Sequence, residues 1–448
     1  MNFDQALAYL LSLGHETLTI KLGLKNTEIL LDSLGNPHKQ FPSVQIAGTN
    51  GKGSVAVILD SICRAAGIRT GCFTSPHLIS ITERISINGE QISEAGFAWL
   101  TERVKETAAE LVAQNRLETL PTFFEHVTAI ALLAFSEAKV ELAILETGLG
   151  GRLDSTTAVG ADIVAITPIA MDHEEYLGHT LAEIASEKAA TIRPGVTAVI
   201  APQDDEALQV ILNRCKAVGV NPRFVDASER FPGETETSAD GQYVVTLSHG
   251  DREYENVRLG LRGRHQLTNA SIAIALAEAL RERGFPIDQG AIAEGIESAR
   301  HPGRLEIHES QPRILFDGAH NPAAARVLRD YLAEFVKVPI TMIFGAMRDK
   351  SLNEMAAILF PKADELVLAS LDNPRAASIE MLLAAVPASF DMTTVRQTAS
   401  LADALQLARG ITSAKGLICV TGSLHLVGAV QEILNRESRS VAHQPEAN

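Results

Sequence analysis

The chain has 448 residues, of which 46% are hydrophobic and 21% are charged, the composition of a globular protein with a large apolar core. Its formal net charge of −16 argues against a nucleic acid or an anionic membrane as a partner, so an anionic ligand would depend on local cations, backbone amides or a metal ion. The four cysteines have no paired spacing, and neither a signal peptide nor a membrane span is visible, so we expect a cytoplasmic protein.

Short runs rich in valine and isoleucine alternate with helical patterns in the first two thirds of the chain. This alternation is typical of βαβ units with a mostly parallel sheet. Strands are predicted at 44–48, 69–73, 141–146, 162–167 and 196–200, with helices that begin near Ser54, Glu94, Phe124 and Leu181. A polar passage at 221–258 indicates a few antiparallel strands, and a helix is predicted over 265–283. We expect residues 1–299 to form one α/β domain.

A second alternating series begins near Arg304. Strands are predicted at 313–317, 339–344, 364–370 and 416–421, with helices around 322–335, 351–359, 399–410 and 425–436. Pro302 and Gly303 interrupt the pattern between the two series, which predicts a hinge at 298–303. We therefore expect a smaller, Rossmann-like α/β domain at 300–436 and a flexible tail at 437–448.

Residues 48–54, Gly-Thr-Asn-Gly-Lys-Gly-Ser, follow the first predicted strand and form the most informative motif. Glycines let successive backbone N–H groups face one anion, and the next helix directs its positive end at the same charge. Lys52 adds a point charge for terminal phosphates. The motif departs from the common P-loop in two ways. Ile46 stands five residues before Gly51, where the P-loop has its first glycine, and Gly53 separates Lys52 from the hydroxyl of Ser54. An ordinary strand-to-helix turn is the alternative, but the motif favours a P-loop ATPase domain.

Three other polar segments follow predicted strands and should meet the same edge of the sheet. They are residues 74–77, 146–154 and 172–173. Hydroxyl, carboxylate and imidazole groups beside phosphates suggest magnesium, with Glu146 as the first candidate ligand. Two alternatives stay open, since Glu146 could be solvated or cap a helix, and Asp172 with His173 could start a helix around a packed imidazole.

Taken in order, these and further segments resemble those of the bifunctional dihydrofolate synthases/folylpolyglutamate synthases of the Mur ligase superfamily. The segments are 48–54, 74–78, 146–154, 172–173, 176–178, 187–189, 263–266 with Asn269, 301–304 and 317–322, within a resemblance that spans about 1–430. The resemblance implies an ATP-dependent ligase that adds L-glutamate to dihydropteroate, forming dihydrofolate, and to reduced folates, forming polyglutamates. The reaction would pass through an acyl phosphate, and the enzyme would be a monomer that binds small molecules.

The resemblance also implies roles for individual residues, with Lys52, His173 and Lys188 as the catalytic ones. Nucleotide contacts are expected from Thr49, Asn50, Gly51, Lys52, Gly53, Ser54, Asn269, Arg304, Asp317 and His320. Two magnesium ions would be held by Ser75, Glu146, His173 and Lys188, the last matching a lysine that this family carbamylates. The pteroate would contact Thr122, Phe123, Phe124, Glu125, Leu153, Asp154 and Ser155.

Several readings remain open at this stage. Two adjacent phenylalanines at a helix start are typical of a core, Lys188 beside Glu187 fits a solvated helix face, and Arg304 could form a structural salt bridge. Thr157 stands where the family motif has asparagine, which puts detail of the pteroate contact in doubt. The functional alternatives are a folylpolyglutamate synthase alone, another Mur-type amino-acid ligase and a noncatalytic ATP-binding module. A muramyl-nucleotide ligase is disfavoured because only about 43 residues precede the first strand.

Overall fold

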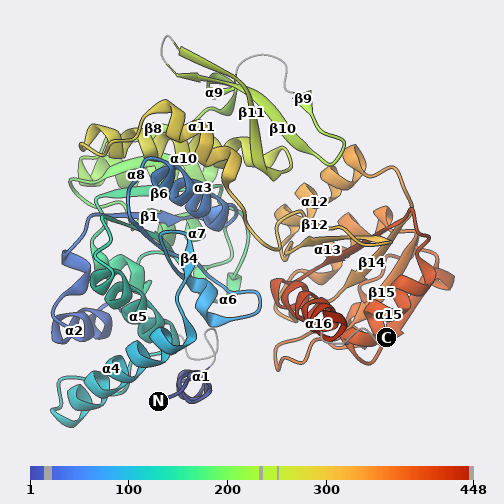
Figure 1. Cartoon of the computed structure of the whole chain (residues 1–448), viewed down its shortest axis with the longest axis horizontal. Coiled ribbons are helices and arrows are strands. Elements are labelled where there is room, and N and C mark those ends of the chain that lie inside the picture. The colour runs from blue at the N-terminus through green and yellow to red at the C-terminus, as the bar shows by residue number, and fades with distance from the viewer. Residues whose placement is uncertain (15–22, 232–235, 250–251, 443–448) are drawn as a thin grey trace, which may run out of the picture.

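The computed structural model describes residues 1–14, 23–231, 236–249 and 252–442, and it contains two α/β domains joined between α11 and β12 (Figure 1). The N-terminal domain is built on an eight-stranded sheet with the order β4-β3-β2-β5-β1-β6-β7-β8. Its strands are β1 (Ser43–Ala47), β2 (Thr70–Phe73), β3 (Ile85–Ile87), β4 (Glu90–Gln91), β5 (Leu142–Glu146), β6 (Ile163–Ile166), β7 (Thr197–Ile200) and β8 (Arg223–Phe224). From β2 to β8 the neighbours are parallel, which confirms the predicted sheet and all five predicted strands.

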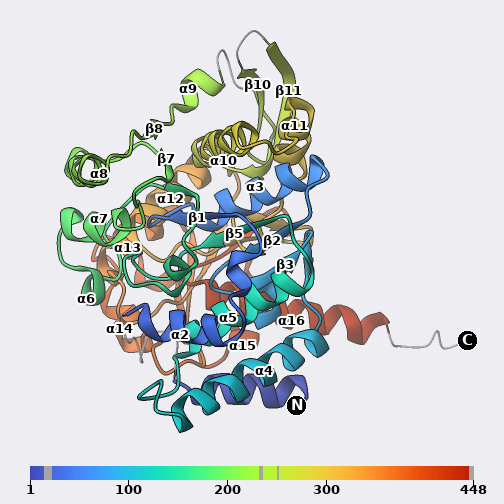
Figure 2. The same cartoon turned by 90° about the vertical axis from the view of Figure 1, so that its left-hand side faces the viewer.

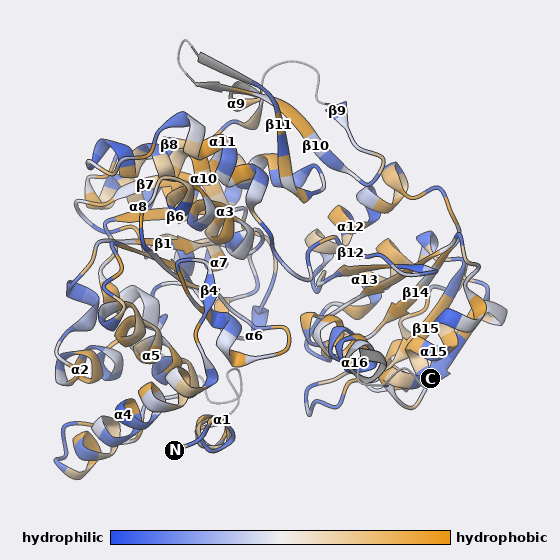
Figure 3. Cartoon of the chain, in the orientation of Figure 1, coloured by the Kyte–Doolittle hydropathy of each residue, from blue (hydrophilic) through white to orange (hydrophobic). Residues whose placement is uncertain are grey.

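Helices cover both faces of this sheet, and the central strand β1 is buried at every position. Such two-sided burial explains why the strands read as continuous apolar runs, and Figure 3 shows apolar residues concentrated on them. One face packs on α3 (Lys52–Ala65), α10 (His265–Glu282) and α11 (Gln289–Ser298). The other packs on α4 (Glu94–Ala113), α5 (Phe123–Glu137), α7 (Leu181–Ala189) and α8 (Asp205–Val218), with α1 (Phe3–Ser12) and α2 (Lys25–Ser33) outside.

The local sequence explains where the helices near the cavity begin. Thr122 caps α5 and Thr180 caps α7, each in a capping box with the glutamate three residues later. Gly51 precedes α3 with a φ of 90°, a left-handed conformation that glycine adopts without strain. The predicted helix starts at Glu94, Phe124 and Leu181 are thus confirmed to within a residue, and α3 begins two residues before Ser54.

A small antiparallel sheet stands apart from the large one in both views of the fold (Figures 1 and 2). Its strands are β9 (Glu236–Thr237), β10 (Gln242–His249) and β11 (Arg252–Arg262), which confirms antiparallel strands in this region and extends them beyond residue 258. The turn before β10 reaches the other domain, because the Tyr331 hydroxyl donates a hydrogen bond of 2.7 Å to the Asp240 carbonyl. Short helices α6 (Glu174–Leu177) and α9 (Ala227–Arg230) complete the domain.

The C-terminal domain has a six-stranded sheet with the order β12-β13-β17-β14-β15-β16, in which only β12 is antiparallel to its neighbour. Its strands are β12 (Glu306–His308), β13 (Arg313–Asp317), β14 (Ile340–Phe344), β15 (Glu365–Ala369), β16 (Val395–Thr398) and β17 (Leu417–Thr421). One face packs on α12 (Pro322–Phe335), α13 (Leu352–Leu359) and α14 (Ile379–Ala384), and the other on α15 (Leu401–Ile411) and α16 (Leu424–Ala442). The four predicted strands are confirmed.

The end of the chain differs from the expected flexible tail at 437–448. Helix α16 does not stop at residue 436 but continues to Ala442, and Figure 2 shows it extending past the rest of the domain. Glu437 pairs with Arg409 of α15 at 3.0 Å and the Ser438 hydroxyl donates to the Leu434 carbonyl, so polar contacts support the extra turn. Residues 443–448 lie outside the described residues. Across the part of the chain that the structure describes, none of the helices combines the length and the hydropathy of a membrane span.

Candidate active site

A cavity of about 980 Å³ is lined by residues of both domains, at the carboxyl ends of the strands in each sheet. The structure brings every predicted site residue to its wall, as expected if the polar segments share one edge. These residues are Thr49, Asn50, Gly51, Lys52, Gly53, Ser54, Ser75, Thr122, Phe123, Phe124, Glu125, Glu146, Leu153, Asp154, Ser155, His173, Lys188, Asn269, Arg304, Asp317 and His320.

The glycine-rich loop lies between β1 and α3, and hydrogen bonds from its backbone amides hold it in place. The amides of Thr49 and Asn50 donate to the Pro168 carbonyl at 3.2 and 3.1 Å. The amides left for an anion are therefore those of the first turn of α3, which have no partner within the helix. Lys52 Nζ donates to the Thr49 carbonyl at 3.1 Å, so the ammonium group already lies over the loop. This geometry fits a phosphate site.

Glu146 ends β5 beside this loop and is 5% exposed. Its Oε2 accepts a hydrogen bond of 3.0 Å from the Ser75 amide. Burial raises the pKa of Glu146, while the charges of Lys52 and Arg304 oppose that rise. Among the described residues, no three His, Cys, Asp or Glu side chains gather as a self-sufficient metal site. An oxygen set of Glu146, Ser75 and nucleotide phosphates fits magnesium, which commonly bridges protein and phosphate.

Lys188, on α7, points into the sheet edge rather than to solvent. The side chain is buried, and its Nζ donates a hydrogen bond of 2.8 Å to the Gly48 carbonyl at the start of the loop. Burial, together with the charge of Lys52, lowers the pKa of Lys188 to about 7. The alternative of a solvated helix face is therefore wrong. A lysine with this pKa carries a free amine in a large fraction of molecules near neutral pH, as a reaction with carbon dioxide requires.

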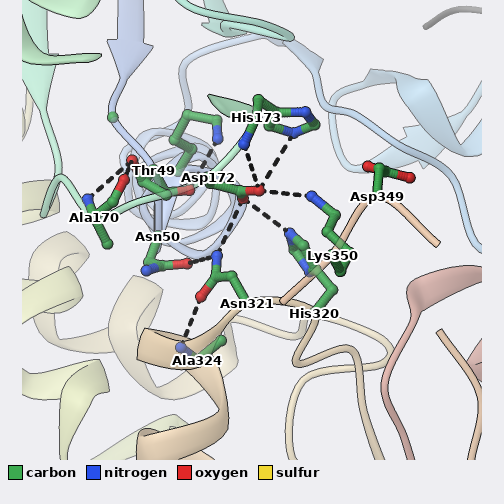
Figure 4. Close-up of polar contacts among 12 residues, drawn as sticks. Thr49, Asn50, Ala170, Asp172, His173, His320, Asn321, Ala324, Asp349 and Lys350 are labelled. Atoms are coloured by element: carbon green, nitrogen blue, oxygen red, sulfur yellow. Dashed lines mark hydrogen bonds and ion pairs between the residues drawn. The ribbon is translucent and has the colours of Figure 1, made fainter. Parts of the chain in front are cut away.

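Asp172 is the centre of the polar contacts between the two domains (Figure 4). Its Oδ1 lies 2.6 Å from Lys350 Nζ, and its Oδ2 accepts a hydrogen bond of 3.1 Å from Asn321 Nδ2 and lies 3.6 Å from His320 Nε2. Burial alone would raise the pKa of Asp172, but the nearby His320 imidazole and the charge of Lys350 hold it well below its usual value. The carboxylate is thus an anion shared by both domains.

Asn321 links this centre to the phosphate loop, and His173 adjoins Asp172 in the chain. His173 precedes α6 with a φ of 51°, and burial lowers its pKa to about 3, so the imidazole is neutral, the form that binds metals. Asn321 caps α12 with its carbonyl oxygen and donates from its amide nitrogen to Asn50 Oδ1 at 3.0 Å. Sequence reasoning missed Lys350 and Asn321 as site residues. A usable signal was that Lys350 follows β14, whose carboxyl end meets the same cleft.

The substrate wall predicted around Phe124 contains both core and cavity residues. Phe123, the first residue of α5, is 4% exposed and packs in the hydrophobic core. The alternative that this ring is a core residue therefore holds, although Phe123 also contributes to the cavity wall. Phe124 is partly buried, and its ring lies so near Gly148 that a Cβ there would be 2.4 Å from the ring. Glu125 closes the α5 capping box through the Thr122 amide at 2.7 Å.

Asp154 also lines the cavity and is held by backbone amides. Burial raises its pKa, while hydrogen bonds from Thr156 and from the Leu149 amide oppose that rise. Leu149 donates to its Oδ2 at 2.9 Å. Thr157, which departs from the family motif, lies behind the wall and does not line the cavity.

Arg304 and Asp317 come from the C-terminal side of the hinge. Among the described residues Arg304 forms no ion pair, and its guanidinium donates to the Gly318 carbonyl at 3.5 Å, which argues against a structural salt bridge. Asp317 accepts hydrogen bonds of 3.0 Å from the Leu305 and Ala319 amides. Burial raises the pKa of Asp317, and the charge of Arg304 opposes the rise. Both side chains line the cavity that the phosphate loop also lines.

Two family models match the two domains in the same order. The Mur ligase middle domain matches residues 46–277, and the glutamate ligase domain of the Mur ligases matches residues 303–424. With a phosphate loop in the first domain and a shared cavity between the two, the fold and the site define an ATP-dependent ligase of the Mur type.

Relatives along the whole chain narrow this class. The chain is 34% identical to the dihydrofolate synthase/folylpolyglutamate synthase of Mycobacterium tuberculosis, over 92% of this chain and 90% of that protein. It is 37% identical to a probable bifunctional folylpolyglutamate synthase/dihydropteroate synthase of Halobacterium salinarum, over 99% of this chain but 52% of that protein, so it spans about half the length of this relative. The chain belongs to the dihydrofolate synthase/folylpolyglutamate synthase family of Mur ligases.

Solved structures agree in fold. FolC of Escherichia coli in complex with DHPP and ADP superposes with a TM-score of 0.84 at 31% identity, covering 98% of this chain and 99% of that one. The bifunctional enzyme of Yersinia pestis in complex with AMPPNP and a manganese ion gives a TM-score of 0.81 at 31% identity, covering 97% and 98%.

Proposed function

We propose that this enzyme uses ATP and magnesium to join L-glutamate to dihydropteroate, forming dihydrofolate, and to reduced folates, forming polyglutamates. The observation that carries the proposal is the single cavity, in which the phosphate loop, the Glu146 carboxylate and the Phe124 wall face residues of the glutamate ligase domain. Relatives along the whole chain bear both activity names, and the Escherichia coli structure holds ADP and DHPP together.

In the first step a carboxylate of the pteroate or folate attacks the γ-phosphate of ATP, which releases ADP and leaves an acyl phosphate. Lys52 and the first-turn amides of α3 hold the phosphates, and Arg304 approaches from the C-terminal domain. Phosphoryl transfer needs positioning and charge neutralisation more than covalent help from the protein. Asn269 belongs to the same nucleotide site, since its amide oxygen would touch a Cβ at Gly51 at 2.4 Å.

Magnesium would neutralise the charge on the phosphates and on the transferred phosphoryl group. We assign one ion to Ser75 and Glu146 and a second to His173 and carbamylated Lys188. The carbamate forms when the free amine of Lys188 adds to carbon dioxide and loses a proton, which turns a buried cation into an anion. The pKa of about 7 and the burial of Lys188 support this assignment.

In the second step the amino group of L-glutamate attacks the acyl carbon, and phosphate leaves as the amide forms. We place glutamate against the C-terminal domain, residues 300–436, and ATP and the pterin in the N-terminal domain, residues 1–299. The match of residues 303–424 to a glutamate ligase domain supports this division. Thr122, Phe124, Asp154 and Ser155 would then contact the pteroate.

The test is glutamate-dependent phosphate release from Mg-ATP, with 7,8-dihydropteroate and a reduced folate supplied separately and the products identified by mass. Turnover of both substrates is the expected result. Turnover of the folate alone would reduce the assignment to a folylpolyglutamate synthase. No turnover of either, with Lys52→Ala as the blank, would point to another Mur-type ligase or a noncatalytic ATP-binding protein and would overturn the proposal.

We also propose that the enzyme is a cytoplasmic monomer. All four cysteines are buried and unpaired with one another, as in proteins of a reducing compartment. Light scattering of the purified protein and fractionation of cells would test the two statements separately.

A further inference from the structure

A buried polar network lies directly behind the cavity wall and has no part in the mechanism above. Gln45, in the middle of β1, is fully buried, and its Nε2 lies 2.7 Å from Thr157 Oγ1, 3.0 Å from Thr156 Oγ1 and 3.3 Å from Thr147 Oγ1. None of these four residues lines the cavity. A polar side chain in the centre of an otherwise apolar sheet is costly to bury, so its contacts call for an explanation.

The directions of these hydrogen bonds are fixed by the threonines. Thr157 Oγ1 donates its single hydrogen to the Gly151 carbonyl at 2.7 Å, and Thr156 Oγ1 donates its hydrogen to Asp154 Oδ1 at 2.5 Å. Both hydroxyls can therefore only accept from Gln45, which must present its NH₂ group to them. The Gln45 Oε1 atom has no partner among the described residues. The Gln45 side-chain amide is thus oriented to donate hydrogen bonds, while its carbonyl oxygen accepts none from the described residues.

Through these hydroxyls Gln45 holds the loop that carries the candidate substrate residues. Asp154 Oδ1 also accepts from the Thr156 amide at 3.0 Å, so Thr156 fixes the carboxylate that faces the cavity. Thr157 fixes the carbonyl of Gly151 in the middle of the same loop. The loop also packs closely on α7, because a Cβ on Gly151 would lie 2.8 Å from the Glu187 carbonyl.

We infer that Gln45 and Thr157 are positioning residues for the pteroate, an inference that rests on the proposed function. They clamp residues 147–155 between β1 and α7, so that Asp154 and Ser155 face the substrate while Glu187 and Lys188 back the loop from the other side. Neither residue touches substrate. Their loss acts on binding of the pteroate through the loop and leaves the nucleotide side, which is built on α3, unchanged.

The test compares Thr157→Val, which keeps the shape but removes the hydroxyl, with Thr157→Ser, which restores it. Thr412→Val is the matched control, because Thr412 is also buried and its hydroxyl lies 2.6 Å from Thr341 Oγ1 within the C-terminal domain. We expect Thr157→Val to raise the KM for dihydropteroate on the order of tenfold, since a small misplacement of binding groups is costly, with the KM for ATP unchanged. Thr157→Ser should return to the wild-type KM, and Thr412→Val should lower only Tm.

Gln45→Met removes the same hydrogen bonds from the other side and replaces Thr157→Val if that variant does not fold. An unchanged KM for dihydropteroate in a folded variant, or an equal rise of the KM for ATP, would overturn the positioning role while the proposed function stands. A wild-type enzyme that turns over neither pteroate nor folate would overturn the proposed function and this inference together.

Discussion

Lys350 Nζ lies 2.6 Å from Asp172 Oδ1, and this ion pair joins the two domains across the cavity. The two side chains are 8% and 7% exposed, so the pair is nearly removed from water in the arrangement seen here. A buried pair of this kind owes its stability to both partners, because either charge alone would be left in a poor solvent. The pair therefore favours the arrangement in which the two halves of the site face each other.

Lys350→Met should shift the enzyme toward an open arrangement in which water reaches Asp172. Removing one partner of a buried pair costs about 3 kcal/mol or more, so we expect kcat/KM to fall roughly 100-fold. Asp172→Asn in the Lys350→Met background should recover part of the loss, which steady-state kinetics and a double-mutant cycle would measure. Arg409→Met, which breaks a partly exposed ion pair with Glu437 inside one domain, should leave kcat/KM unchanged. Strict additivity of the two cleft substitutions would contradict this account.

Gly51→Ala should abolish nucleotide binding for a reason that goes beyond backbone strain. Both Gly51 and Gly195 have a left-handed φ, of 90° and 85°, so alanine strains either site by about 1 kcal/mol. At Gly51 the new Cβ would also lie 2.4 Å from Asn269 Oδ1, whereas at Gly195 it would meet nothing within 4 Å. Calorimetric titration with ADP should show binding by Gly195→Ala and none by Gly51→Ala. Equal affinities in the two variants would remove the loop from the nucleotide site.

Gly148→Ala should weaken the pteroate side alone. The added Cβ would lie 2.4 Å from Phe124 Cζ, so the ring must leave its place on the cavity wall. We expect the KM for dihydropteroate to rise on the order of tenfold while the KM for ATP stays constant. Gly410→Ala, where the Cβ has open space, is the control. A rise in the KM for ATP would mean that Phe124 serves the nucleotide instead.

His126→Gln should make the fold less sensitive to acid. Burial lowers the pKa of His126 from 6.5 to about 4, so between these values the unfolded chain binds a proton that the folded chain does not. The stability that depends on neutral His126 is complete above pH 6.5 and is lost as the pH falls toward 4. The difference between the two pKa values corresponds to about 3 kcal/mol in the free energy of unfolding.

Glutamine retains bonding groups for Tyr9 and for the Thr122 carbonyl, which hydrogen-bond with His126, but does not titrate. Urea unfolding at pH 7 and pH 4.5 should therefore show a smaller loss for His126→Gln than for the wild type. His179→Gln, at a side chain that is 80% exposed, should lose as much as the wild type. Equal losses in all three proteins would mean that another group controls the acid response.

Lys188→Ala should be inactive but partly rescued by small carboxylates such as formate or acetate. The truncated side chain leaves room at the sheet edge, where a free carboxylate can take the place of the carbamate. Lys52→Ala should show no rescue, because a carboxylate cannot replace a cation at the phosphates, and its kcat should fall on the order of 10³-fold. Phosphate release assayed over a series of carboxylate concentrations measures both effects. A failure of rescue at every concentration would weaken the carbamate assignment.

The sequence predicted the parts of the site that are encoded locally. The strands beside Lys52, Glu146 and Asp317 are apolar runs, and their carboxyl ends must lie at a shared edge once the strands are parallel. The edge strands β12 and β16 escaped prediction because they are short and owe their state to a neighbouring strand. The extra turns of α16 escaped because their sequence is polar and their support comes from α15.

The contacts that depend on tertiary placement could not be read in advance. Asp172 receives Asn321 and Lys350 from positions 149 and 178 residues away, so only the docking of the two domains brings them together. Gln45 offered a faint signal, because it is a polar residue inside an apolar run. Its partners could be identified only from the structure of the loop after β5. The same holds for Thr157. Its sequence position suggested a doubtful substrate contact, whereas the structure places it behind the cavity wall, in contact with Gln45.

The hydrogen bond from Tyr331 to the Asp240 carbonyl, made by the small antiparallel sheet, also limits how the cleft can open. A single connecting segment would let the C-terminal domain swivel in any direction. A second point of attachment beside the connection at 298–306 restricts the directions in which that domain can turn. We therefore expect Lys350 and Asp172 to meet in the same relative position each time the cleft closes after product release.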